Sequence, residues 1–230
     1  MADKNFNFDD IEYGKRYETV ARQAIFGYEQ LFPMIMGYLA AGVGDKANVL
    51  VVGAGTGMEL VTFGTHQPAW SMTGVDPSEQ MIGIARHNVQ NHGLAERVTL
   101  VQGYVDALPL DAPFDAATLI LVMQFLPDDG SKLALLQSIA KRLKPGAKLA
   151  LVDTHGDPSS IEFAQTLAAW KPYLKVMGMA PEVIPALLEN GLKSLFPITE
   201  ARTQALLQEA GFTKITHFYS AHLYGGWIAQ

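Results

Sequence analysis

Three glycines and one aspartate are the residues of this sequence whose spacing points most directly to chemistry. Gly53, Gly55 and Gly57 follow an apolar run and precede a helix-like stretch at residues 58–61. Glycines at a strand-to-helix turn let a ligand approach bare backbone amides. Asp76 ends the next apolar run, where a carboxylate can accept both hydroxyls of a ribose. The pattern predicts a site for a nucleotide-like cofactor.

The spacing of the glycines distinguishes this turn from two familiar phosphate-binding loops. The dinucleotide fingerprint G-x-G-x-x-G needs its third glycine at the position of Met58. A Walker loop needs Gly-Lys-Ser/Thr, which does not follow. A structural glycine-rich turn in some other α/β protein is the alternative that the turn alone leaves open.

Composition predicts a globular protein with a sizeable core. The chain has 230 residues, of which 49% are hydrophobic and 17% charged, so it fits one domain with an elaboration. The net charge of -6 and the lack of a Lys/Arg run disfavour a nucleic-acid partner. The absence of cysteine excludes disulfides and a Cys nucleophile. Without a signal peptide or an apolar stretch approaching about 20 residues, we expect a cytoplasmic protein with no membrane span.

Strands and helices are predicted to alternate between residues 46 and 153. Such alternation predicts a parallel sheet with right-handed crossovers, and the candidate ligand groups lie where open α/β sheets bind ligands, at the carboxyl ends of strands. The apolar runs predict strands at 49–52, 71–76, 98–102, 114–122 and 148–153. Helices are expected at 58–64, at 78–91 with Ser78 as its cap, and at 133–143, with a turn at 144–147.

Helical segments are expected on both sides of this core. Residues 1–45 form an N-terminal helical segment over the cofactor cleft, with Pro33 kinking or breaking the helix. Its polar and aromatic side chains either reach the site or only pack the helices onto the sheet. The side chains concerned are Tyr13, Arg16, Tyr17 and Tyr28.

The rest of the chain is expected to add a lid and to complete the sheet. Residues 154–198 form a helical lid insertion, with helices over roughly 159–178 and 181–192. Residues 199–230 supply a final helix, for which Thr199 or Ser194 is a candidate cap, and a hairpin of two strands. The 46–153 core and this hairpin together make the sheet.

The order and spacing of these features resemble the class I methyltransferases that use S-adenosylmethionine (SAM). The resemblance runs from about residue 46 to the C-terminus. It implies a Rossmann-like, doubly wound α/β sheet of about seven strands, mostly parallel, with a C-terminal antiparallel hairpin. It is carried by 51–57, 74–78, 101–103, Phe114-Asp115, 124–126 and 142–146.

The same resemblance implies SAM as the cofactor and S-adenosylhomocysteine as the product. The implied activity is in-line transfer of the methyl group to a small-molecule acceptor. The electrophile is already activated, so the protein mainly supplies alignment, which can be worth ~7–11 kcal/mol. The implied cofactor-binding residues are Tyr28, Gly53, Ala54, Gly55, Thr56, Gly57, Asp76, Pro77, Met81, Gly103, Tyr104, Val105, Ile120, Leu121 and Gln124.

Part of the chain is similar to the carboxy-SAM synthase branch of the family. The similarity lies in residues 123–126, in residues 224–229 and in the Phe-Gly-Tyr context of Tyr28. That branch holds the extra carboxylate with an arginine in its C-terminal insertion. This chain has no arginine between Arg142 and Arg202, although a bidentate carboxylate clamp needs a guanidinium or an equivalent.

Two departures from the family pattern keep other functions open. Val51 stands where motif I usually has an acidic residue, and Tyr104 stands where an aspartate usually pairs with the adenine. They motivate a non-catalytic SAM-binding protein as one alternative, and a carboxy-SAM synthase-like enzyme is the other. A nicotinamide-dependent oxidoreductase is a third candidate, and Met58 disfavours it.

His155 is the best candidate for a general base, because it lies two residues after the fifth predicted strand, on the ligand edge. The alternative is a loop histidine that hydrogen-bonds to backbone. No His and acidic residues have metal-ligand spacing, so no metal is expected. An apolar lid of this kind often packs against a second copy, which leaves a homodimer as one expectation.

Overall fold

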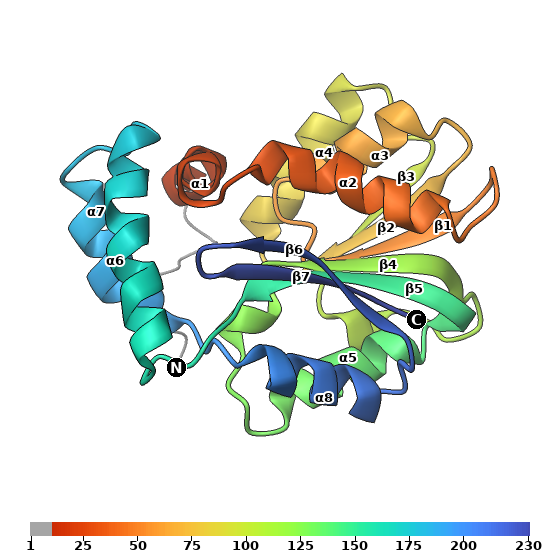
Figure 1. The fold of residues 1–230 in the computed structure, drawn as a ribbon. Coiled ribbons are helices and arrows are strands. Elements are labelled where there is room, and N and C mark those ends of the chain that lie inside the picture. Colours follow the sequence, from red (N-terminus) through yellow and green to blue (C-terminus); the bar gives the residue numbers. More distant parts are fainter. Residues whose placement is uncertain (1–10) are drawn as a thin grey trace.

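A seven-stranded sheet forms the centre of the molecule in the computed structural model, which describes residues 11–230 (Figure 1). The strand order is β3-β2-β1-β4-β5-β7-β6. Strand β7 is antiparallel to both its neighbours, and the other pairs are parallel. The predicted fold class is therefore confirmed. The strands are β1 (Asn48–Val52), β2 (Ser71–Asp76), β3 (Val98–Gln102), β4 (Phe114–Ile120), β5 (Leu143–Thr154), β6 (Ile215–Ala221) and β7 (Tyr224–Ala229).

Helices cover both faces of the sheet, as Figure 1 shows. One face carries α2 (Tyr28–Ala40), α3 (Met58–His66) and α4 (Glu79–Asn91), and the other carries α5 (Ser131–Ala140) and α8 (Glu200–Glu209). Successive side chains of a strand point to opposite faces. In β1, Val49 and Val51 therefore enter one hydrophobic core, while Leu50 and Val52 enter the other.

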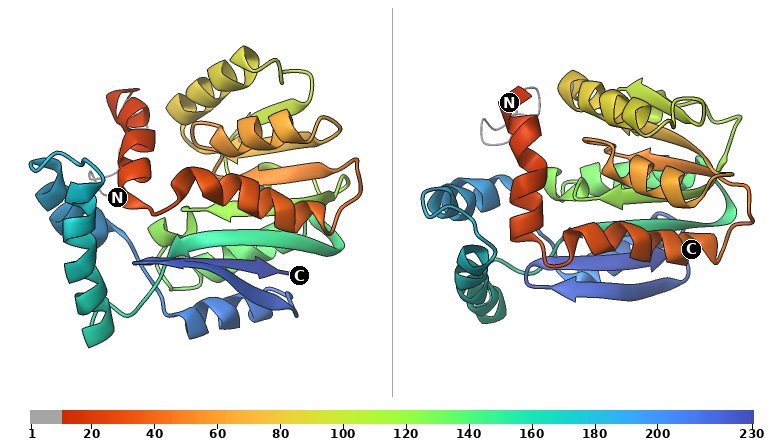
Figure 2. Two further views of the ribbon diagram at one scale, coloured as in Figure 1. Left: turned by 45° about the horizontal axis from the view of Figure 1, so that its top comes forward. Right: turned by 90° about the horizontal axis from the view of Figure 1, so that it is seen from above.

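The remaining helices lie together beyond the carboxyl ends of the parallel strands. Helix α1 (Ile11–Ala24) lies beside α6 (Ile161–Val176), as Figures 1 and 2 show. The indole Nε1 of the buried Trp170 donates to the carbonyl oxygen of Ala24 at 2.7 Å. The side chain of Gln23 donates to the carbonyl oxygen of Gly178 at 3.0 Å. These bonds join the N-terminal segment to the insertion.

The remaining elements are short helices and helical turns between the longer elements. After α6, helix α7 (Val183–Ala186) continues into a π-turn, η3 (Leu187–Gly191), and a 3-10 turn, η4 (Leu192–Ser194). Two further 3-10 turns, η1 (Val105–Ala107) and η2 (Met123–Phe125), follow β3 and β4. Within residues 11–230, no helix combines the length and the apolar character that crossing a membrane requires.

The N-terminal helices break at Gly27, and the prediction of a break at Pro33 is wrong. Gly27 has φ 70°, a left-handed conformation that ends α1 and starts α2. Pro33 lies inside α2 on its exposed face. There, water can hydrogen-bond to the carbonyl that loses its N–H donor. Residues 1–10 of the predicted N-terminal segment lie outside the described residues.

Two other local predictions need correction, and two are confirmed. Residues 144–147 belong to β5, where the pairing with β4 shifts register between Leu143 and Lys148, a stretch that contains Gly146 with φ 77°. The single helix expected over 181–192 is replaced by α7 and the two turns, because the backbone leaves α-type hydrogen bonding at Leu187. Ser78 and Thr199 cap α4 and α8 as predicted, accepting from backbone N–H groups three residues on.

Candidate functional site

A cavity of about 1430 Å³ opens at the carboxyl ends of β1, β2 and β4. It is larger than the roughly 300–1,000 Å³ of a typical small-molecule pocket, so it can hold a nucleoside-sized ligand and a second molecule. The glycine turn after β1 and the loop after β3 contribute backbone to its wall. Helices α1 and α2 contribute Tyr17, Tyr28 and Phe32, and the insertion contributes Ser194 and Phe196.

Each glycine of the turn after β1 has a left-handed backbone. The φ angles are 72° at Gly53, 50° at Gly55 and 84° at Gly57. The N–H groups of Gly53 and Ala54 both donate to the carbonyl oxygen of Val75, at 2.8 and 3.0 Å, which ties the turn to β2. A Cβ on Gly53 would overlap the side chain of Val122. The turn therefore needs glycine at this position for both conformation and space.

Replacing Gly53 by alanine is expected to lower the free energy of unfolding by about 2–4 kcal/mol, because left-handed strain adds to the overlap with Val122. Gly83→Ala is the matched control. Gly83 is exposed in α4, nothing lies within 4 Å of its added Cβ, and alanine there should stabilise by about 0.5–1 kcal/mol. Urea unfolding of both variants measures the difference. Equal effects would show that the turn tolerates a side chain.

Asp76 connects the glycine turn to the start of α4. It ends β2 and is only 9% exposed. Its Oδ2 accepts from the N–H of Gly55 at 2.9 Å, and its Oδ1 accepts from the N–H of Ser78 at 2.9 Å. A carboxylate oxygen has more than one lone pair, so both oxygens can accept further hydrogen bonds. The carboxylate is thus fixed at the cavity wall in one orientation.

A second carboxyl group, Glu59, lies in the cavity wall, in the first turn of α3. It is 6% exposed, and its Oε1 accepts from the hydroxyl of Thr118 at 2.5 Å. Burial raises the pKa of Glu59 to about 8, because desolvation disfavours the charged form and the hydrogen bond from Thr118 offsets only part of that cost. Burial also raises the pKa values of Tyr17 and Tyr28, which line the same cavity. All three groups are therefore neutral at pH 7.

The loop after β4 forms an apolar wall of the cavity. Phe125, Leu126 and Pro127 line it. The N–H of Phe196, which follows η4, donates to the carbonyl oxygen of Gln124 at 2.8 Å and brings the end of the insertion against this loop. Phe196 lines the cavity as well.

A buried lysine hydrogen-bonds to the backbone of this loop from the protein interior. Lys132 of α5 is 1% exposed, and its Nζ donates to the carbonyl oxygen of Met123 at 2.7 Å. Asp153 of β5 is 2% exposed, and its Oδ1 accepts from the N–H groups of Gln124 and Thr154, each at 3.1 Å. Burial raises the pKa of Asp153 to about 7, and the charge of Lys132 opposes that rise. Burial lowers the pKa of Lys132.

Thirteen of the fifteen residues predicted to bind the cofactor line this cavity, and two do not. Gly57 instead packs against α4, since a Cβ there would lie 3.2 Å from Ala85. Gln124 is buried under the loop, where its Oε1 accepts from the N–H of Thr154 at 3.3 Å. The lining residues are Tyr28, Gly53, Ala54, Gly55, Thr56, Asp76, Pro77, Met81, Gly103, Tyr104, Val105, Ile120 and Leu121.

The predicted general base, His155, does not line the cavity. Its ring packs edge-on against Trp227, with the ring centroids 5.6 Å apart. Its backbone N–H donates to Leu223, and its Nε2 is buried without a hydrogen-bond partner among the described residues. Burial lowers its pKa. A lowered pKa favours the neutral imidazole that a general base requires. The ring nevertheless packs against the terminal hairpin and away from the cavity.

The N-terminal aromatic residues divide in the same way. Tyr17 and Tyr28 line the cavity, and Arg16 is exposed. The side chain of Tyr13 lies outside the described side chains. Glu59 is the residue that sequence reasoning missed. Its position four residues before the buried Phe63 places it on the buried face of α3, and that spacing is the signal that could have found it.

The fold is Rossmann-like, and the cavity lies at the carboxyl ends of the strands, where folds of this class bind their ligands. A family profile described as a methyltransferase domain matches residues 49–146. The chain is 30% identical over 218 residues to a 2-phytyl-1,4-naphtoquinone methyltransferase from Synechococcus elongatus, covering 88% of this chain and 86% of the relative. The chain belongs to the class I SAM-dependent methyltransferases.

Other relatives are more distant or longer. A carboxy-S-adenosyl-L-methionine synthase from Chromohalobacter salexigens is 25% identical over 94% of this chain and 79% of its own length. An O-methyltransferase family protein from Burkholderia thailandensis shares the fold, with a TM-score of 0.61, 16% identity and coverage of 88% of this chain. This chain spans 56% of that structure. It also spans 42% of a release factor glutamine methyltransferase from Chlorobaculum tepidum, at 30% identity over 136 residues.

Proposed function

We propose that the protein transfers a methyl group from SAM to a small, largely apolar acceptor by in-line displacement. The observation that carries this proposal is the contrast between two walls of one cavity. Glycine amides and the Asp76 carboxylate form one wall, and Phe125, Leu126, Pro127 and Phe196 form another. A charged or strongly polar acceptor would find few partners on the apolar wall.

The residues fit the cofactor that the family uses. Asp76 would accept the ribose hydroxyls while the amides of Gly55 and Ser78 hold its orientation. Tyr104 and Val105, from the loop after β3, would flank the adenine. When bound, SAM supplies a methyl group that is already activated for nucleophilic attack. The chain then has to align the acceptor and exclude water, for which apolar side chains suffice.

The names of the relatives support an apolar acceptor class. One is named for a phytylated naphthoquinone, and the Burkholderia structure is named for O-methylation. A phenol or quinol has an ionisable hydroxyl or a nucleophilic ring carbon, and its ring is apolar. Such a molecule could lie against the loop after β4 without needing an ion pair.

Label transfer tests this function directly. The protein is incubated with methyl-labelled SAM and a panel of phenols, quinols and, for contrast, aliphatic carboxylates, and products are identified by mass spectrometry. Label is expected in a phenol or quinol. Label in the carboxylates alone would contradict the apolar acceptor. Tight SAM binding with no transfer to any acceptor, in the panel or in a metabolite extract, would instead favour the non-catalytic alternative.

Phe196→Ala is expected to lower kcat/KM for the acceptor found in this way by about tenfold, because it removes an apolar contact while the glycine turn and Asp76 are untouched. The dissociation constant for SAM should stay within about twofold. Ile161→Ala is the matched control, since Ile161 is 73% exposed on α6 and does not line the cavity. Equal kinetics for the two variants would remove Phe196 from the acceptor site.

A further inference from the structure

Glu59 is a buried carboxyl group that the proposed reaction leaves without a role. Its one hydrogen bond among the described residues comes from Thr118. No lysine or arginine of the described residues forms an ion pair with it, and none of these described cations lowers its pKa. Burying a carboxyl group without a cation costs free energy in either protonation state. The ionised form loses the hydration of its charge, and the neutral form loses hydrogen bonds to water. A carboxyl group with so perturbed a pKa in the wall of a cavity is a candidate for a functional role.

The surroundings of Glu59 are otherwise neutral or acidic. The charges of Glu59 and Asp76 both help to raise the pKa of Tyr17 in α1. The charge of Glu59 also helps to raise the pKa of Tyr28 in α2. Thr118 lies on β4. These α1, α2, β2 and β4 groups supply hydroxyls and a second carboxylate. A ligand with a positive charge would therefore meet acceptors of hydrogen bonds, and none of the described cations would compete with it for Glu59.

The position of Glu59 relative to the sheet is specific. Its partner Thr118 pairs in register with Val51 of β1, the residue two before the first glycine of the turn. The carboxyl group that β1 lacks at Val51 is thus supplied from α3, against the neighbouring strand. Glu59 and Asp76 line the same cavity.

We infer that Glu59 is a further cofactor-binding residue, whose carboxylate receives a cationic group of SAM and loses its proton when the cofactor binds. The inference rests on the proposed site for SAM. SAM carries a sulfonium and an ammonium group against a single carboxylate, so it brings one net positive charge. An ionised Glu59 neutralises that charge in a site that excludes water, where such a pair is strong.

Binding of SAM is then linked to pH. In the free protein the pKa of Glu59 is raised to about 8, so the group is protonated at pH 7. A nearby cation lowers this pKa and releases the proton. The ratio of wild-type affinity to that of Glu59→Gln, from which the titration of the cofactor cancels, should therefore rise by about tenfold per pH unit below pH 8 and level off above it.

Calorimetric titration of SAM into the full chain at pH 7, in two buffers with different ionisation enthalpies, measures the released proton. The wild type is expected to release close to one proton more than Glu59→Gln, a comparison that cancels the titration of the cofactor itself. Glu59→Gln should also bind SAM roughly 10- to 100-fold more weakly. Glu96→Gln, at an exposed position, is the matched control and should bind as the wild type does.

S-adenosylhomocysteine, which keeps the ammonium and lacks the sulfonium, identifies the cation. Equal weakening of both ligands by Glu59→Gln assigns the ammonium, and weakening of SAM alone assigns the sulfonium; either supports the inference. Equal proton release and equal affinity in wild type and Glu59→Gln would overturn it. No acceptor is present in these titrations, so a failure of the proposed acceptor class cannot produce that result.

Discussion

Replacing Asp76 by alanine is expected to weaken SAM binding by about 100-fold. The carboxylate is held by the amides of Gly55 and Ser78, and the proposed ribose hydroxyls would add two charge-assisted hydrogen bonds, each worth roughly 1.5–3 kcal/mol. Alanine removes both carboxylate oxygens, and it also leaves the N–H of Gly55 in the glycine turn without its acceptor. Calorimetric titration with SAM and with S-adenosylhomocysteine gives the affinities.

Stability has to be separated from affinity in this variant. The two backbone amides left without Asp76 should cost about 1–3 kcal/mol of unfolding free energy, so titrations belong well below the measured Tm. Asp111→Ala is the control, because Asp111 is exposed on the loop before β4. A folded Asp76→Ala protein with an affinity within threefold of the wild type would show that Asp76 serves the turn alone.

Replacing Lys132 by alanine is expected to lower the free energy of unfolding by about 3–5 kcal/mol, one of the largest effects of a single substitution in this chain. The change removes buried methylene groups, the hydrogen bond to Met123 and the charge that opposes the protonation of Asp153. Urea unfolding at pH 7 measures it. Lys141→Ala, at the exposed end of α5, should change stability by less than about 0.5 kcal/mol.

A double variant separates charge from packing at this position. Lys132→Met keeps most of the apolar stem, and Asp153→Asn keeps an oxygen for the amides of Gln124 and Thr154. Together they remove both charges, and replacing a buried pair by neutral groups is often nearly neutral in free energy. The double variant should therefore be more stable than Lys132→Met alone. A double variant that is less stable would mean that the lysine charge itself stabilises the loop.

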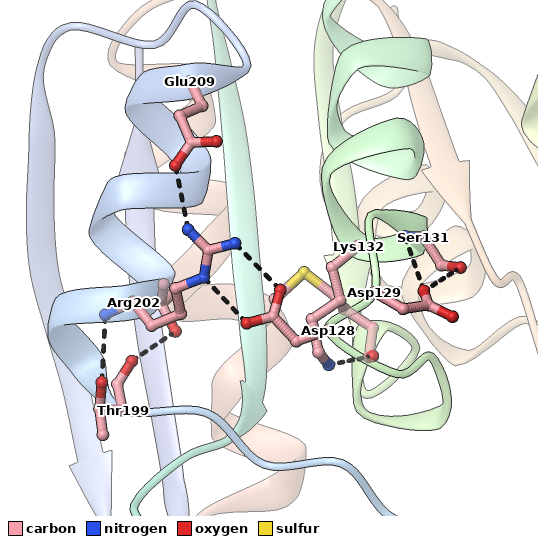
Figure 3. Close-up of polar contacts among 9 residues, drawn as sticks. Asp128, Asp129, Ser131, Lys132, Thr199, Arg202 and Glu209 are labelled. Atoms are coloured by element: carbon pink, nitrogen blue, oxygen red, sulfur yellow. Dashed lines mark hydrogen bonds and ion pairs between the residues drawn. The ribbon is translucent and has the colours of Figure 1, made fainter.

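The surface beside this lysine carries a separate ion-pair network that should matter much less. Arg202 of α8 donates to both carboxylate oxygens of Asp128 and to Glu209 (Figure 3). Its side chain is 39% exposed, and solvent screens such pairs to about 0–1 kcal/mol. The network joins α8 to the loop after β4, while Lys132 supports the same loop from the interior.

The alternation of strands and helices along the chain, and the glycine turn, could be predicted because local sequence determines them. Apolar runs such as Val49–Val52 are buried on both faces of a parallel sheet, and Ser78 and Thr199 are caps that need no tertiary contact. Asp76 was predictable from its place at the end of a strand. These features depend on residues within a few positions of one another.

Features that depend on distant residues could not be predicted in this way. The sequence correctly places His155 near the end of a strand. The direction of its ring, however, is set by Trp227 and by the hairpin around Leu223, which are distant in the sequence. Gln124 turns inward because Thr154 offers it an N–H. The chain breaks at Gly27 and α2 continues through Pro33, because Pro33 lies on the exposed face of α2. There, water can hydrogen-bond to the carbonyl oxygen that proline leaves without an N–H donor. Periodicity carries none of this information.

The bond between Trp170 and Ala24 has a consequence for how fast ligands exchange. Helix α1 supplies Tyr17 to the cavity wall, and the insertion that contains α6 supplies Phe196. Because the two segments are joined, a molecule that leaves between them must break this bond or displace both segments at once. Amide protons in α1 and α6 should then exchange with solvent on one shared timescale, and a slow rate there would set a lower limit on the residence time of the product.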